Sequence, residues 1–231
     1  MPQPPLRGEL EKRTEPLLQL GSTLGEGGFG VVVEAERGQS SASGLQPAGE
    51  GAASRLAVKM FRVGGARGHD ERVKLEAVMW EVHVLRALRH ENIVRLLDVV
   101  ELADALVYIV MERIEGPDLH EFLCAQPKGR LAEGTARHFF RHMLAAVRHA
   151  HGRGFMHGDL KPANVKLQTG GPRLDAASGR MSAVVVDWGL SRKIDGAQPA
   201  ALTMGTALYA CLLYTSPSPR DATLSRMPSS A

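Results

Sequence analysis

Residues 157–164 read His157-Gly158-Asp159-Leu160-Lys161-Pro162-Ala163-Asn164, a polar loop in the second half of the 231-residue chain. The loop follows a stretch of helical periodicity over residues 137–151. A second polar turn, Asp187-Trp188-Gly189, follows a short apolar run that predicts a strand over residues 183–186. Taken singly, Asp159 is a common turn former and Asn164 a common loop cap. Their chemistry therefore depends on what the rest of the chain carries.

Upstream of this loop, residues 17–34 predict a strand, a glycine turn and a second strand. The turn contains Gly25, Gly27 and Gly30 in the spacing G-x-G-x-x-G. Dinucleotide-binding folds use the same spacing, but there a helix follows, whereas here the next residues are Val31-Val32-Val33. We therefore predict a flap whose backbone lies against phosphates, because a Cβ at the glycines would hold the backbone away.

Other periodic segments predict strands early in the chain and helices later. One amphipathic helix is predicted over residues 70–88, with the apolar positions Val73, Ala77, Val78, Val82, Leu85 and Leu88. The helix over residues 137–151 carries Phe140, Met143, Leu144, Val147 and Ala150 along one face. This order indicates an α+β fold of two lobes rather than a repeating βαβ unit. Further strands are predicted over residues 56–61, 93–100 and 105–111, a short helix over 119–123, a loop insertion over 38–54 and a hairpin turn over 169–179.

The composition, 44% hydrophobic and 23% charged residues, is that of a globular domain and excludes a disordered tail or a coiled coil. The longest apolar run, residues 106–111, has the length of a strand, so we expect no membrane span. The formal charge of +3 is scattered along the chain, which argues against nucleic-acid binding. Cys124 and Cys211 cannot form a disulfide framework, and residues 1–6 lack an apolar signal core. We therefore expect an intracellular protein, cytoplasmic or nuclear.

Five motifs in a fixed order make the chain resemble the eukaryotic protein kinase family. After the glycine turn, Ala57-Val58-Lys59 matches the V-A-I-K strand, and Glu81 lies on the helix that follows. Residues 157–164 match H-R-D-L-K-P-x-N, Asp187-Trp188-Gly189 matches D-F-G, and Gly205-Thr206-x-x-Tyr209 resembles the end of the activation segment. The resemblance implies a two-lobed kinase-like fold with a flexible segment over residues 1–16, an N-lobe over 17–111 and an incomplete C-lobe over 112–210.

The resemblance also implies an activity, the transfer of phosphate from ATP to Ser and Thr hydroxyls of protein substrates. Lys59 would contact the α- and β-phosphates, and Glu81 would hold it by an ion pair. Asp159 would accept the proton of the substrate hydroxyl, and Lys161 would neutralise the γ-phosphate. Lys161 and Gly205-Thr206 are typical of Ser/Thr kinases.

Mg²⁺ and the nucleotide are assigned by the same resemblance. Asp187 and Asn164 would each ligate Mg²⁺ through oxygen, the ligand that hard cations prefer. His138 and His142 lie four residues apart without the Glu of an H-E-x-x-H pattern, so we predict structural or solvated histidines. In the nucleotide pocket, main-chain groups of Glu112 and Ile114 would bind the base, Met111 would lie behind it and Asp118 would meet the ribose. The implied nucleotide-binding residues are Leu24, Gly25, Gly27, Gly30, Val32, Ala57, Lys59, Met111, Glu112, Ile114 and Asp118.

Three residues depart from the pattern of the family. Gly158 replaces an Arg that normally pairs with a phosphorylated activation segment, and it should also leave the backbone before Asp159 less constrained. Trp188 replaces Phe beneath the helix that carries Glu81. Lys166 stands where an apolar side chain usually floors the adenine pocket, although its methylene stem could serve. These departures keep open an alternative, a pseudokinase or ATP-binding scaffold without transfer activity.

The last 21 residues, 211–231, lose all periodicity and resemble a translated sequencing adapter, which would make Cys211 foreign to the natural protein. We therefore expect the natural sequence to continue beyond Ala210 into further C-lobe helices. Without such helices, the helix over residues 137–151 would expose much of its apolar face. A loss of buried area at about 25 cal/mol per Å² easily exceeds a net stability of about 5–15 kcal/mol. We therefore expect the 231-residue polypeptide by itself to be unstable or inactive.

Overall fold

The fold is known from a computed structural model that describes residues 11–13, 18–27, 30–37, 55–62, 69–102, 106–169 and 181–194. Several sequence predictions lie outside these residues. They are the insertion over residues 38–54, most of the turn over 169–179, the motif Gly205-Thr206-x-x-Tyr209, and the adapter-like tail with Cys211.

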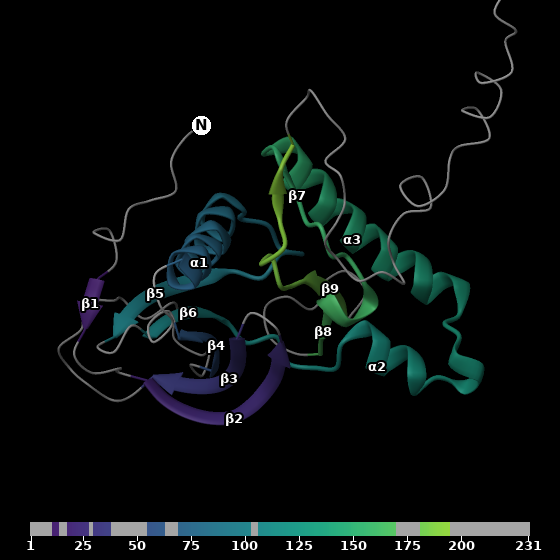
Figure 1. Cartoon of the computed structure of the whole chain (residues 1–231). Helices are drawn as coiled ribbons and strands as arrows, with labels where there is room; N and C mark the ends of the chain where they lie inside the picture. The colour runs from purple at the N-terminus through teal and green to yellow at the C-terminus, as the bar shows by residue number, and fades with distance from the viewer. Residues whose placement is uncertain are drawn as a thin grey trace, which may run out of the picture.

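The first lobe is built on a six-stranded sheet in the order β1-β5-β6-β4-β3-β2 (Figure 1). All neighbouring strands from β5 to β2 pair antiparallel. The glycine turn joins two strands, as predicted, and the predicted pair of strands before residue 112 is also confirmed. The five strands are β2 (Leu18–Gly27), β3 (Gly30–Arg37), β4 (Arg55–Arg62), β5 (Leu96–Leu102) and β6 (Leu106–Glu112).

The sixth strand, β1 (Glu11–Arg13), was not predicted. It pairs parallel to β5, with Glu11 opposite Val100 and Arg13 opposite Leu102. An edge strand such as β5 presents unpaired backbone N–H and C=O groups, which an extended segment can satisfy whatever its side chains are. Residues 11–13 therefore depart from the flexible segment expected over residues 1–16.

One long helix, α1 (His69–Ala87), lies along the sheet and confirms the helix predicted over residues 70–88. From Val78 onward its apolar side chains are buried or, as with Trp80 and Ala87, partly buried, and Val82 and Leu85 share one core cluster with Ile109 of β6. Val73 was predicted on the same face but is exposed. It lies near the start of the helix, before the residues that pack in the core.

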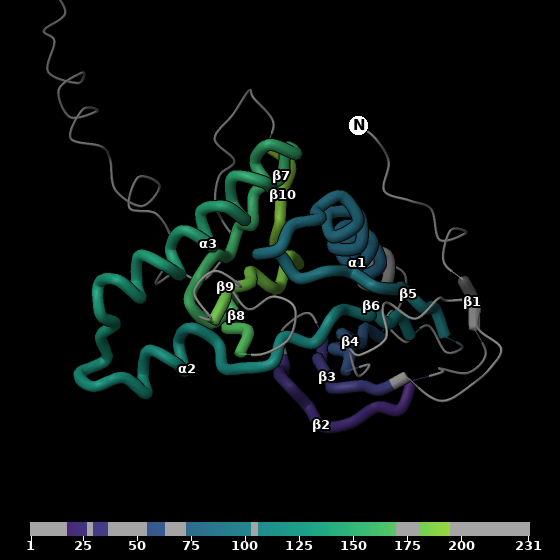
Figure 2. Tube along the Cα trace, turned by 180° about the vertical axis from the view of Figure 1, so that it is seen from behind, coloured from purple at the N-terminus to yellow at the C-terminus, as the bar shows by residue number. Residues whose placement is uncertain are grey.

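The second part of the chain carries the helices α2 (Leu119–Cys124) and α3 (Glu133–Gly152), as Figure 2 shows from behind. No helix within the described residues is long and apolar enough to cross a membrane. Two short antiparallel pairs accompany the helices, β8 with β9 and β7 with β10. Of these four strands the sequence predicted only β9, which alone ends in a continuous buried apolar run before a polar turn. Their bounds are β7 (Phe155–Met156), β8 (Val165–Gln168), β9 (Ser182–Val185) and β10 (Arg192–Lys193), with 3₁₀ turns η3 (Pro127–Gly129) and η4 (Pro162–Asn164).

The apolar face of α3 is only partly buried. Phe139, Ala146 and Ala150 are its buried residues, whereas Phe140 is 61% exposed and Leu144 55% exposed. The predicted face was therefore wrong for Phe140 and Leu144. Around the helix, Phe140 lies about 100° and Leu144 about 140° from Phe139, which packs inward with Ala146.

The two parts of the chain are joined where the segment after α1 meets β9. The backbone N–H of Val94 donates to Val185 O at 3.0 Å, and that of Val185 donates to Asn92 O at 2.8 Å. The side-chain amide of Asn92 also donates to Ala183 O at 2.9 Å. These bonds hold the end of β9 against the first lobe and thereby bring Asp187, two residues later, next to β4.

Candidate active site

A cleft of about 540 Å³ opens between the sheet and the second part of the chain. It is lined by the predicted site residues except Gly27. They come from β2, β3, β4, α1, β6 and the segment after it, the loop before β8, β8 itself and the segment after β9. Other lining residues were missed, because apolar or charged neighbours of a motif carry no signal of their own: Glu26, Val94, Arg113, Ala163, Val186 and Leu190. The predicted residues that line it are Leu24, Gly25, Gly30, Val32, Ala57, Lys59, Glu81, Met111, Glu112, Ile114, Asp118, Asp159, Lys161, Asn164, Lys166 and Asp187.

The glycine turn lies at one end of the cleft. Gly27, the last residue of β2, pairs with Gly30, the first residue of β3. Gly30 has φ +144°, and a Cβ there would lie 2.5 Å from Met60 O on β4. Any larger residue at position 30 would push β3 away from β4, so this glycine is required by close backbone packing.

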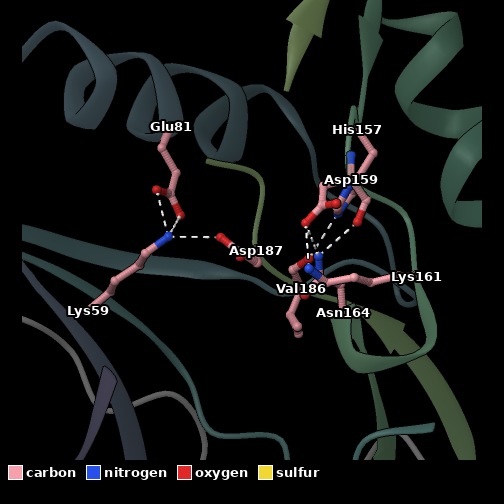
Figure 3. Close-up of polar contacts among 8 residues, drawn as sticks. All are labelled: Lys59, Glu81, His157, Asp159, Lys161, Asn164, Val186 and Asp187. Carbon is pink, nitrogen blue, oxygen red and sulfur yellow. Dashed lines mark hydrogen bonds and ion pairs between the residues drawn. The ribbon is translucent and has the colours of Figure 1, made fainter. Parts of the chain in front are cut away.

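Lys59 lies at the centre of an ion-pair cluster (Figure 3). Its Nζ is 2.9 Å from both carboxylate oxygens of Glu81 and 2.9 Å from Oδ1 of Asp187. Period-two alternation along β4 turns Lys59 and Ala57 toward the cleft, while Leu56 and Val58 pack in the core on the other side. Three segments that are far apart in sequence therefore place charged groups on one point of the cleft wall.

The three charges of this cluster shift one another's pKa. Burial acts to lower the pKa of Lys59, but the two neighbouring carboxylates outweigh burial and raise it above its ordinary value. Burial raises the pKa of Glu81, whose side chain is 3% exposed, and the charge of Lys59 offsets part of that increase. Asp187 is 45% exposed, and Lys59 lowers its pKa despite partial burial. Lys59 is therefore charged and Asp187 ionised near neutral pH.

A second cluster faces it in the loop over residues 157–164. The side-chain amide of Asn164 donates to Asp159 O at 2.8 Å and to Asp159 Oδ2 at 3.1 Å. The ammonium of Lys161 is 2.8 Å from the same Oδ2. The carboxylate of Asp159 is thus held in one orientation by a cation and an amide, as Figure 3 shows.

His157 connects the two clusters, a role that the sequence did not predict. Its Nδ1 accepts from the backbone N–H of Asp159 at 3.2 Å, so Nε2 carries the proton and donates to Val186 O at 2.9 Å. Burial lowers the pKa of His157, which favours this neutral form. The buried ring of Trp188 lies 4.6 Å from the imidazole between ring centroids. His157 therefore fixes the backbone of Asp159 relative to the residue that precedes Asp187.

Gly158 lies between these contacts in a left-handed backbone conformation, with φ +81°. A Cβ there would come within 2.3 Å of Leu190 O. The sequence predicted that glycine would loosen this backbone, but the backbone here packs closely against the segment after Asp187. Trp188, by contrast, is buried in the core cluster that includes α1 residues, beneath that helix as predicted.

The donor atoms of the cleft suit a hard divalent cation held together with phosphate. Asp187 offers a carboxylate, and Asn164 offers its amide oxygen, because its amide nitrogen donates to Asp159. Within the described residues, no group of three or more His, Cys, Asp and Glu could hold a metal by itself. Mg²⁺ is usually held in this manner, by one or two protein oxygens plus substrate phosphates.

The histidine pair predicted to be structural has backbone partners. A ring nitrogen of His138, Nε2, lies 2.9 Å from Met181 O, and His142 Nδ1 accepts from the backbone N–H of Ala183 at 3.1 Å. Both histidines therefore hold α3 against β9 and against Met181, the residue before it, which agrees with the predicted structural role of the pair.

Comparison with known proteins places this cleft in a family. The sequence profile of the protein kinase domain matches residues 18–212. The chain belongs to the protein kinase family. This kinase domain is 34% identical over 151 residues to testis-specific serine/threonine-protein kinase 3 of Mus musculus, covering 65% of the chain and 50% of that protein. It is 33% identical over 184 residues to CBL-interacting protein kinase 19 of Oryza sativa subsp. japonica, covering 80% of the chain and 30% of that protein.

The kinase domain spans half or less of the length of these two relatives. Protein kinases in general use ATP and Mg²⁺ and act on protein substrates. The two facing clusters of the cleft, Lys59 with Glu81 and Asp187 and Asp159 with Lys161 and Asn164, supply the cations, carboxylates and amide oxygen that phosphoryl transfer needs.

Proposed function

We propose that this kinase domain transfers the γ-phosphoryl group of ATP to Ser and Thr hydroxyls of protein substrates. The observation that carries the proposal is the pair of charged clusters that face one cleft, Lys59 with Glu81 and Asp187 on one wall and Asp159 with Lys161 and Asn164 on the other. The names of the relatives, which include serine/threonine-protein kinases, support Ser and Thr as acceptors.

In this proposal the cations of the cleft bind and orient the phosphates. Lys59 holds the α- and β-phosphates, and Glu81 fixes the ammonium so that no reorganisation is needed when the nucleotide binds. Lys161 neutralises charge on the γ-phosphate. The carboxylate of Asp159, which Lys161 and Asn164 hold in one orientation, accepts the proton of the attacking hydroxyl. The same contact aims the hydroxyl oxygen of the substrate at the γ-phosphorus.

Asp187 and Asn164 would hold Mg²⁺ through a carboxylate oxygen and the amide oxygen. The ion would supply neutralisation of phosphate charge when bound. For the base, the carbonyl of Glu112 and the N–H of Ile114 are the proposed hydrogen-bonding groups, with Met111 behind them. Leu24, Val32 and Ala57 cover the base, the backbone of Gly25, Gly27 and Gly30 approaches the phosphates, and Asp118 meets the ribose.

The proposed domain boundaries follow the two parts of the fold. In this division, an N-lobe over residues 17–111 and a partial C-lobe over residues 112–210 share the cleft. Residues 211–231 are assigned as a foreign tail outside the kinase domain. An intracellular location, in cytoplasm or nucleus, suits a domain that consumes ATP and carries an exposed free thiol at Cys124.

Phosphorylation of a generic basic protein tests the proposal and separates it from its alternative. The complete natural protein, incubated with radiolabelled ATP and Mg²⁺, is expected to label Ser and Thr of the substrate, as identified by phosphoamino-acid analysis. A scaffold without transfer activity would bind ATP, measured by calorimetry, and leave the substrate unlabelled. That result would contradict the proposal, because every group needed for transfer would be present without effect.

A prediction about regulation follows from Gly158. Kinases with Arg at this position can pair it with phosphate on the activation segment through charge-assisted hydrogen bonds. Glycine offers no such partner, so activity is expected to be independent of phosphorylation at Thr203 or Thr206, which lie outside the described residues. The measurement compares activity before and after phosphatase treatment. A fall of more than about tenfold would contradict the prediction and would point to Arg192 or Lys193 as substitute partners.

A further inference from the structure

Lys166 places a cation on the floor of the cleft, beside the carboxylate of Asp118. Both residues line the cleft, and Lys166 Nζ lies 4.0 Å from Asp118 Oδ2. The two side chains are 28% and 16% exposed, and the two backbones form a β-bridge that holds the residues in register. The ion pair is therefore positioned by the fold rather than by the chance approach of two flexible side chains.

The other oxygen of Asp118 is also engaged. Asp118 is the N-cap of α2, where Oδ1 accepts from the backbone N–H of Glu121 at 2.8 Å. Glu121 reciprocates, because its Oε2 accepts from the backbone N–H of Asp118 at 2.9 Å. This capping box fixes the carboxylate at the start of α2. Each oxygen of Asp118 consequently has a protein partner before any ligand enters.

This arrangement bears on how the cleft treats a sugar hydroxyl. A site whose buried polar group depends on a ligand hydroxyl rejects an analogue that lacks it, because the group is then left unpaired. Asp118 avoids that penalty, since the ammonium of Lys166 stays beside Oδ2 when no hydroxyl is present. The flexible four-carbon stem of Lys166 lets the ammonium give way to a hydroxyl or close the remaining distance.

We propose that Lys166 is a specificity-determining residue that makes the ribose subsite tolerant of a missing hydroxyl, so that deoxy-ATP binds almost as well as ATP. The inference rests on the proposed function, in which Asp118 meets the ribose. The class of ligand is adenosine triphosphates with ribose or deoxyribose.

Equilibrium binding to the complete natural protein tests the inference without any assay of transfer. Isothermal titration calorimetry with Mg²⁺ gives the Kd of ATP, 2′-deoxy-ATP and 3′-deoxy-ATP, so that whichever hydroxyl faces Asp118 is examined. For the unchanged protein, both deoxy analogues are expected to bind within about threefold of ATP. In Lys166→Met, one analogue should bind more weakly than ATP by about tenfold or more, because Asp118 then lacks its cation.

Matched variants separate this role from a general effect of removing a lysine. Lys74→Met makes the same change at an exposed position on α1 outside the cleft, and it should leave every Kd ratio unchanged. Asn retains the ability to cap α2, so Asp118→Asn keeps the cap while it removes the charge and replaces one acceptor oxygen by an NH2 group. In that background, adding Lys166→Met should no longer change the ratio. Lys166→Gln, which keeps a polar side chain of similar length, replaces the Met variant if thermal unfolding shows that the latter does not fold.

The outcomes distinguish this inference from the proposed function. Tight binding of ATP with rejection of either analogue by the unchanged protein would overturn the inference alone. An unchanged ratio in Lys166→Met, or in Lys166→Gln in its place, would overturn it as well, because another group would then be satisfying Asp118. Absence of binding by ATP and by both analogues would overturn the proposed function, and this inference with it.

Discussion

Asp187→Asn is expected to remove phosphoryl transfer almost completely, lowering kcat by more than about 10³-fold, or ~4 kcal/mol. The substitution keeps the size of the side chain and removes the negative charge that would hold Mg²⁺. That charge is present throughout the neutral range, because Lys59 lowers the pKa of Asp187 against the effect of partial burial. Steady-state kinetics of the complete natural protein at saturating ATP measures the loss.

Two controls make the Asp187 result specific. Asp98→Asn makes the same change on β5, where Asp98 Oδ1 accepts from the backbone N–H of Val99 at 2.8 Å, and it should leave kcat unchanged. Asp187→Asn should also unfold close to the temperature of the unchanged protein, since Lys59 keeps its two bonds to Glu81. Near-normal turnover in a folded Asp187→Asn protein would show that the assigned metal role is wrong.

The charged groups of the cleft could be predicted because each lies in a short string whose neighbours set its position. Lys59 alternates with buried residues on β4, and Asp187 follows a run of buried residues in and after β9. Glu81 was assigned by the resemblance to protein kinases, and its place three residues after Val78, on the inward face of α1, agrees with that assignment. Local periodicity predicts the strand or helix that carries each residue, whereas the resemblance supplied its role.

Contacts between distant segments were not accessible in the same way. The bond from His157 to Val186 joins residues 29 positions apart, and the strand β1 has three residues and no period. The backbone of Gly158 packs closely against Leu190. The sequence shows only a glycine there, which by itself predicts a less constrained backbone. The pairing of Lys166 with Asp118 likewise depends on a β-bridge between a helix cap and a strand. Each of these features is fixed by tertiary packing.

Lys59→Met is expected to impair both catalysis and stability. Transfer should fall by about 10²–10⁴, because the phosphates lose a fixed cation in the transition state. Folding should also suffer, because Glu81, with a side chain 3% exposed, would be left as a buried charge without its partner. Breaking a buried pair in this way typically costs about 3–5 kcal/mol. Turnover numbers and thermal unfolding of the complete natural protein measure the two effects separately.

The stability loss in Lys59→Met should depend on pH, with a sign set by Glu81. Burial already raises the pKa of Glu81, and removing Lys59 takes away the charge that offsets this increase. A carboxyl whose pKa is higher in the folded than in the unfolded state binds more protons when folded, so lower pH favours folding through that group. The deficit in unfolding temperature, relative to the unchanged protein, should therefore be smaller at about pH 5 than at about pH 8. In Lys59→Met with Glu81→Gln the deficit should vary less between these two pH values than in Lys59→Met alone, because Glu81 no longer titrates, whereas Asp187 still does. A pH-independent deficit in Lys59→Met would mean that Lys59 does not balance the charge of Glu81. Near-normal turnover in this variant would mean that Lys59 does not bind the phosphates.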